Sequence, residues 1–172
     1  SNYETTISLL QERLDEKTID VGVKNMSLLQ ALSKIGFPIG KKHKRLWIPT
    51  DFYKLDWKYK KFIIRGLFDT DGCITSRKDE GYKYPHIFIT SKSTKLIKQL
   101  YILLRNQGYP VYVTKKGEDI VLKGIKNTLR WMSDIGSNNK RHLVKYHYWL
   151  EKRVLPTNTN WAGSSAWKNF GQ

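Results

Sequence analysis

Two carboxylates stand close together at the end of a predicted helix, in the segment FIIRGLFDTDG over residues 62–72. Asp69 and Asp71 fall in its last turn, and Gly72 is predicted to end the helix in the left-handed conformation. The negative end of a helix dipole disfavours acids by about 0.3–1 kcal/mol each, so folding alone would favour lysine or arginine there. A divalent cation would reverse the sign of that penalty, because carboxylate oxygens suit Mg²⁺. The pattern therefore predicts a cation site at this helix end.

The same helix carries a stripe of small and apolar residues that predicts a helical partner. Ile63, Gly66, Leu67 and Thr70 fall at i, i+3, i+4 and i+7. Gly66 and Thr70 are small enough to let another backbone approach closely. If two such helices pack with their C-termini level, two Asp71 carboxylates converge and need a cation between them. The alternative is an ordinary core helix that buries this stripe within its own chain.

The elements that position these residues follow from hydrophobic periodicity. Alternation predicts strands and 3.6-residue spacing predicts helices, which together give an α+β fold. The predicted helices cover residues 5–16, 26–35, 57–71, 93–106, 125–135 and 142–153, and the predicted strands cover 73–77, 84–90, 111–115 and 119–122. We expect a helical extension over residues 1–56 packed on the core, a core domain over 57–155, and a tail over 156–172.

Residues 64–72, IRGLFDTDG, resemble the LAGLIDADG motif of the homing endonucleases. The letters agree at five positions, which are Gly66, Leu67, Asp69, Asp71 and Gly72. The resemblance implies an αββαββα core whose curved antiparallel sheet forms a saddle on the DNA major groove. It also implies that the motif helices of two such units form the interface between them. The order of elements predicted after residue 57 agrees with this core.

The resemblance also implies roles for residues around the motif. Asp71 corresponds to the catalytic carboxylate, and with Gly72 it would hold Mg²⁺, with Mn²⁺ as a second candidate and Ca²⁺ as a substitute that does not support cleavage. Asp69 corresponds to a structural position. Ser91, in IFITSKST, lies where family members order the water network.

A basic residue near the scissile phosphate is expected from the segment DIGSNNKRHLVK. Lys140 is the first candidate, and Arg141 and Lys145 are its competitors. The alternative for Lys140 is a solvated helix face.

The predicted DNA-binding face follows from the two-residue period of strands. Polar and aromatic residues share one face, while Ile87, Ile89, Val111 and Val113 face the other way. A β-ribbon with such a face fits the major groove, and the alternative is a solvated sheet face, although the predicted face carries no acids. The predicted DNA contacts are Cys73, Thr75, Arg77, Tyr82, Tyr84, His86, Tyr112, Thr114 and Lys116, with Arg141 near the active end.

Composition agrees with a nucleic-acid partner. The 172 residues carry 31 Lys and Arg against 15 Asp and Glu, a net charge of +16, and such excess commonly serves to bind phosphates. The alternative is a basic protein without that role. A single cysteine excludes an internal disulfide. Apolar runs too short to span a bilayer and the lack of an apolar leader predict an intracellular protein that is neither secreted nor membrane-bound.

These observations predict a homing endonuclease, associated with an intron or intein, that hydrolyses double-stranded DNA with a divalent metal. One motif per chain predicts a homodimer on a nearly palindromic site. The competing arrangement is the second half of a two-motif chain. A hypothesis from another class is a non-catalytic module on the same fold, either an intron RNA maturase or a DNA-binding regulator.

Overall fold

The computed structural model describes residues 7–13, 18–23, 25–34, 36 and 46–156. The chain divides into two compact units, Ser1–Gly40 and Lys41–Gln172. The expected boundary at residue 56 falls inside the second unit, because Ile48 is buried in its core and Phe52 packs against that core. Of the predicted tail, only Pro156 belongs to the described residues.

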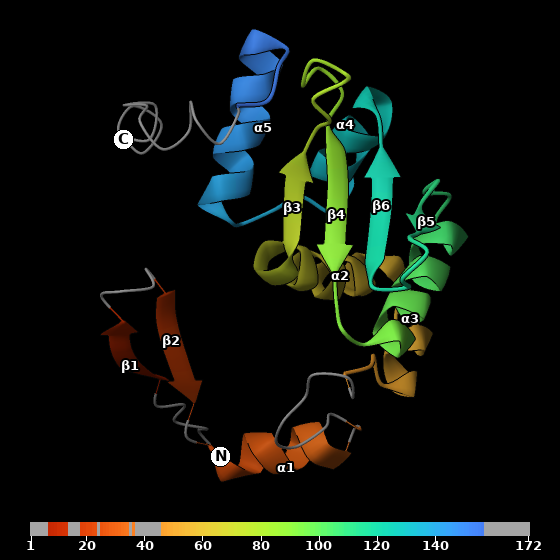
Figure 1. The fold of residues 1–172 in the computed structure, drawn as a ribbon. Helices are drawn as coiled ribbons and strands as arrows, with labels where there is room; N and C mark the ends of the chain where they lie inside the picture. Colours follow the sequence, from red (N-terminus) through yellow and green to blue (C-terminus); the bar gives the residue numbers. More distant parts are fainter. Residues whose placement is uncertain (1–6, 14–17, 24, 35, 37–45, 157–172) are drawn as a thin grey trace. The chain divides into compact units, whose positions relative to one another are not determined.

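The first unit contains a hairpin followed by a helix (Figure 1). Strand β1 (Ile7–Arg13) pairs antiparallel with β2 (Thr18–Val23), and helix α1 covers Met26–Lys34. The predicted helix over residues 5–16 is therefore wrong. Residues 7–13 pair with β2, which is rich in β-branched residues, and this pairing outweighs the helical spacing of apolar residues within the first segment. The predicted helix at 26–35 is confirmed over Met26–Lys34, and residue 35 lies outside the described residues. The Asn25 side chain accepts from Leu28 N (2.9 Å) at the start of this helix.

The second unit has the αββαββα order that the sequence predicts, with one further helix at the end. Helix α2 (Trp57–Asp71) leads without a loop into β3 (Gly72–Thr75), and β4 (His86–Thr90), α3 (Thr94–Asn106), β5 (Tyr112–Val113), β6 (Asp119–Lys123), α4 (Ile125–Asp134) and α5 (Lys140–Lys152) follow. A short 3₁₀ helix, η2 (Thr50–Lys54), precedes α2. The four strands form one antiparallel sheet in the order β3-β4-β6-β5 (Figure 1).

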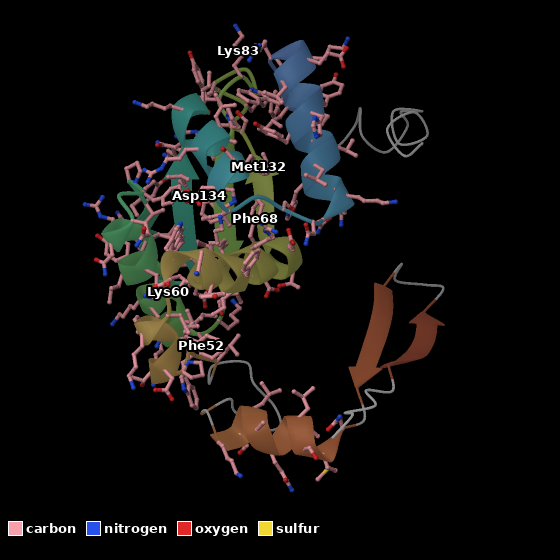
Figure 2. All side chains as sticks on the ribbon, turned by 180° about the vertical axis from the view of Figure 1, so that it is seen from behind. Phe52, Lys60, Phe68, Lys83, Met132 and Asp134 are labelled. Carbon is pink, nitrogen blue, oxygen red and sulfur yellow. The ribbon has the colours of Figure 1, made fainter. Side chains whose placement is uncertain are left out.

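One face of this sheet makes the core. Directly paired residues share a face, so Ile74, Ile87 and Leu122 line up across three strands. They are buried with Ile64 and Phe68 of α2. Each such side chain stabilises the fold by roughly 1.5–3 kcal/mol when fully buried. The α+β LAGLIDADG-like fold is thus confirmed, with its core between one sheet face and the helices (Figure 2).

The junction between α2 and β3 differs from the prediction in its backbone. Gly72 has φ −99° and ψ 170°, which is extended rather than left-handed. Glycine is needed there for space: a Cβ atom would lie 2.4 Å from Phe68 Cδ2 and 2.5 Å from Phe68 O. The chain can turn directly from helix to strand because this residue has no side chain.

Candidate active site and nucleic-acid interface

The carboxylate of Asp71 is exposed at the last position of α2. Its one side-chain hydrogen bond comes from Thr70 Oγ1 (3.3 Å), which also donates to Gly66 O (3.0 Å). Within the part of the chain that the structure describes, no cation pairs with Asp71. An exposed acid at the negative end of a helix therefore remains uncompensated, as the sequence predicted.

Asp69 has a different environment, since its side chain is 18% exposed and lies against the start of α5. It accepts hydrogen bonds from Ser137 Oγ and from the backbone N–H of Asn138 (Oδ2, 3.0 Å) and Asn139 (3.4 Å). Asn139 Nδ2 in turn donates to Asp69 O (2.7 Å). The N-terminal end of α5 is positive, so its dipole compensates the charge of Asp69. Asp69 thus joins the two helices, which agrees with the structural role expected for it.

Helix α5 covers the open edge of β3. His142 Nε2 donates to Gly72 O (3.1 Å), and one turn later Lys145 Nζ donates to Ile74 O (3.3 Å). These two side chains bond carbonyls that no neighbouring strand reaches, because β3 is the edge of the sheet. Burial lowers the pKa of His142 and also that of Lys145. Gly72 O, an expected metal ligand, is therefore already bonded to α5.

The other expected active-site residues lie at the same end of the sheet. Lys140 is exposed at the first position of α5, directly after Asn139, which contacts the backbone of Asp69. Ser91 follows β4 two residues after Ile89, the partner of Gly72. The Ser91 hydroxyl accepts from Ser93 N (3.1 Å), and its own N–H donates to Glu118 O (2.8 Å). Ser91 is half-buried.

The face of α2 that points away from the sheet is open. Gly66 and Thr70 are exposed, whereas Ile63 and Leu67 are half-buried. A Cβ atom on Gly66 would meet no atom of the described residues within 4 Å. The stripe also continues further toward the N-terminus than predicted, with Tyr59 51% and Phe62 54% exposed. Extending the same helical spacing by one turn would have found both aromatic residues.

A comparison with protein families agrees with this geometry: the sequence profile described as a LAGLIDADG-like domain matches residues 58–146, just over half of the chain. This protein belongs to the LAGLIDADG family. The matched segment runs from the first turn of α2 to the middle of α5. A comparison with curated protein sequences gave no significant match. Among the described residues, no helix has the length and hydropathy to cross a membrane.

In this LAGLIDADG core the outer face of the sheet holds only part of the predicted set. Cys73 and Thr75 are exposed on β3, and Tyr112 is 40% exposed on β5. Thr75 pairs with His86, so His86 belongs to this face as predicted. However, His86 is 2% exposed, and its Nε2 lies 3.1 Å from Glu80 Oε2. The loop before β4 covers His86, so its side chain is not exposed for the predicted DNA contact in this structure.

The same loop extends further than predicted, so the second predicted strand begins at His86 rather than at residue 84. Tyr82 has φ +60° and packs against the core cluster, so it is not on the outer face of a strand. Tyr84 is 49% exposed in the loop. Arg77 is exposed but paired with Asp79. No local pattern shows how such a loop folds back on the sheet.

Acids are also present on the outer face, contrary to the prediction. Asp119 accepts from Thr90 Oγ1 (2.7 Å) and from Thr114 Oγ1 (3.0 Å), so the Thr114 hydroxyl already has a partner. Lys123 is exposed, with its ammonium 5.2 Å from the centre of the Tyr112 ring. Lys116, in the turn between β5 and β6, and Arg141, on α5, are exposed as well. The cations of this face are therefore interspersed with acids.

Proposed function

We propose that this protein is a site-specific endonuclease that cleaves double-stranded DNA by metal-dependent phosphodiester hydrolysis, as an intron- or intein-associated homing enzyme. The observation that carries the proposal is the exposed carboxylate of Asp71 at the C-terminus of the motif helix, which has no ion-pair partner among the described residues. Asp69, two residues earlier, is compensated by the start of α5, whereas Asp71 is not. A chain that only bound nucleic acid would gain stability by replacing Asp71 with a neutral residue or a cation.

The residues present fit a divalent cation when two copies meet. Within the described residues, no group of three or more His, Cys, Asp or Glu side chains converges, so one copy offers Asp71 alone. Two copies paired through α2 would bring two hard oxygen donors to one place, which suits Mg²⁺ or Mn²⁺ and, without cleavage, Ca²⁺. When bound, such a cation activates water and stabilises the charge that develops on the phosphate. Gly72 O is a weaker candidate ligand, because His142 Nε2 donates to it.

Pairing through α2 is supported by its open face. Gly66 has free space over its Cα, and Phe62 and Tyr59 expose more than half of their side chains. Small residues beside apolar ones allow close approach of two helices. We therefore propose a homodimer on a nearly palindromic duplex, and the second half of a two-motif chain would use the same face.

Lys140 is proposed as the basic residue near the scissile phosphate. It is exposed and held near the end of α2 through Asn139, whereas Lys145 is half-buried with its ammonium on Ile74 O. An exposed ammonium can reach a phosphate without first breaking a protein hydrogen bond. Ser91 is proposed to hold water at the same end, with its hydroxyl as donor, since that oxygen already accepts from Ser93 N.

The test is selection of cleaved sites from a randomised library of duplexes with Mg²⁺. We expect the wild type to cut a nearly palindromic sequence, and Asp71→Asn to lose cleavage while binding the same duplex in Ca²⁺ at least as tightly. Asp51→Asn, an exposed acid in η2, is the matched control and should cut normally. Normal cleavage by Asp71→Asn would refute the role of Asp71. Tight binding without cleavage by the wild type would favour a DNA-binding regulator, and preferential binding of a structured RNA would favour a maturase.

A further inference from the structure

The outer face of α3 is a ridge of cations on the helical side of the sheet. Lys95, Lys98 and Arg105 are exposed at i, i+3 and i+10, with Ile102 48% exposed between them. We call these four residues the α3 ridge. The buried face of the helix, formed by Leu96, Ile97, Leu100, Leu103 and Leu104, points the opposite way into the core. The ridge extends over about 15 Å, at 1.5 Å per residue.

Helix α4 adds Arg130 at one end of this ridge and carries Lys126 one turn earlier. Lys126 and Arg130 are exposed. The guanidinium of Arg130 donates to Gln107 O (2.6 Å) and Gly108 O (2.8 Å), which follow the end of α3. Arg130 is thereby fixed close to the Arg105 end of the ridge. The guanidinium carbon of Arg130 also lies 4.2 Å from the centre of the Tyr109 ring, a cation–π contact that holds the side chain in place.

Within the described residues, few acids lie near this surface. Helix α3 contains none, and the single acid of α4, Asp134, already has partners. Asp134 accepts from Tyr109 OH (2.8 Å) and Trp57 Nε1 (3.1 Å), and it pairs with Lys61 (3.6 Å).

The contrast with the sheet face is informative. There, Arg77 pairs with Asp79, and Asp119 lies among the threonines of the face, so acids offset part of the positive charge. Directly before α3, Lys92 also pairs with an acid, Glu118. Among the described residues, Lys95, Lys98, Arg105 and Lys126 form no ion pair, so their like charges repel one another. Arg130 also holds the end of α3, and Lys95 lies over the Trp47 ring. A polyanion bound on this side would explain why these cations lack acidic neighbours.

We infer that the α3 ridge, with Lys126 and Arg130, binds the phosphate backbone of a second DNA duplex, without sequence preference. Lys and Arg in a row suit phosphates, and the residue between them, Ile102, cannot read base edges by hydrogen bonding. Single strands are usually held by exposed aromatic rings, but on these helices Trp131 is buried and Tyr101 is half-buried. A duplex is therefore the better fit. This inference rests on the proposed binding of one duplex by the sheet face, but it does not depend on cleavage.

The experiment measures whether the protein brings two duplexes together. Donor- and acceptor-labelled duplexes of unrelated sequence are mixed with the full chain in Ca²⁺, and energy transfer between them is followed against salt. We expect transfer with the wild type and its loss with Lys95→Ala, Lys98→Ala and Arg105→Ala combined, while binding of one duplex remains. Three lost phosphate contacts should reduce the salt slope of second-duplex binding by about 2.7, from 0.9 per contact.

Two control variants separate this surface from general charge. Lys34→Ala, Lys54→Ala and Lys152→Ala combined also removes three exposed cations, and should keep the energy transfer. Lys116→Ala with Lys123→Ala should instead weaken binding of the first duplex. Undiminished transfer with the ridge variant, or an equal loss with the first control, would overturn the inference. Tighter binding of duplex RNA than of duplex DNA to the ridge would overturn the choice of DNA as the occupant. Thermal unfolding of every variant shows that it is folded.

Discussion

Replacing Gly66 by alanine should stabilise the separate chain and weaken its pairing. Gly66 lies within α2, and a Cβ atom there meets nothing within 4 Å. Alanine is better than glycine inside a helix by about 0.8–1 kcal/mol, so the free energy of unfolding of the monomer should rise by that amount. For a chain of 172 residues, 1 kcal/mol corresponds to roughly 2–4 °C in the unfolding midpoint.

The same methyl group has the opposite effect where two α2 helices cross at Gly66. Both copies add a Cβ between the backbones, and overpacking of a close contact typically costs about 1–3 kcal/mol. The dimer dissociation constant should then increase roughly 5- to 150-fold. Cleavage should fall at low protein concentration and recover at high concentration, because the chemistry of Asp71 is unchanged.

Analytical ultracentrifugation over a concentration series measures the dissociation constant, and thermal unfolding below that constant measures the monomer. Ser133→Ala is the matched control: it adds an alanine at an exposed position of α4, gains a few tenths of a kcal/mol, and should leave the dimer unchanged. A stabilised Gly66→Ala chain with unchanged dimer affinity would refute the interface on this face. A wild type that stays monomeric at every concentration, with DNA bound, would favour half of a two-motif protein.

Two further predictions concern stability. Gly72→Ala should destabilise the fold by about 3 kcal/mol, because its Cβ would lie 2.4–2.5 Å from side-chain and backbone atoms of Phe68. Urea unfolding measures the change in the free energy of unfolding. A loss below about 0.5 kcal/mol would show that the junction relaxes. Burial lowers the pKa of both His86, despite the nearby Glu80, and His142, so the folded state favours their neutral forms. Stability should be complete above the unfolded value of about 6.5 and decrease as pH falls through 6.5 toward the folded pKa. Melting between pH 7.5 and 5 should show a smaller loss for His86→Gln or His142→Gln than for the wild type, and an equal loss would contradict the stated pKa directions.

The two acids of the motif show how tertiary contacts divide residues that look alike in sequence. Within α2 alone, both Asp69 and Asp71 are unfavourable, because they lie at the negative end of the helix dipole. The start of α5, about 70 residues later, compensates Asp69 through Ser137, Asn138 and Asn139. The unfavourable position of Asp71 remains, which is the reason for assigning the metal chemistry to it.

Local periodicity was sufficient for most elements of the second unit. The apolar spacing of α3 and α4 follows from contacts within one helix face, and the alternation in β4 and β6 follows from one buried sheet face. The motif letters likewise placed Asp71 and Gly66 on one helix, with the acid at its end. These features depend on neighbours a few residues apart, which a single sequence displays directly.

Other features depended on residues far apart in the chain, and only the tertiary structure decided them. The β1 hairpin replaced a helix because β2 supplied a partner, and Gly72 is required because of the space beside Phe68 rather than for its φ angle. His86 alternates correctly but is buried, since a folded loop brings Glu80 over it. Periodicity determines the face on which a side chain lies, whereas its exposure depends on which distant segment covers that face.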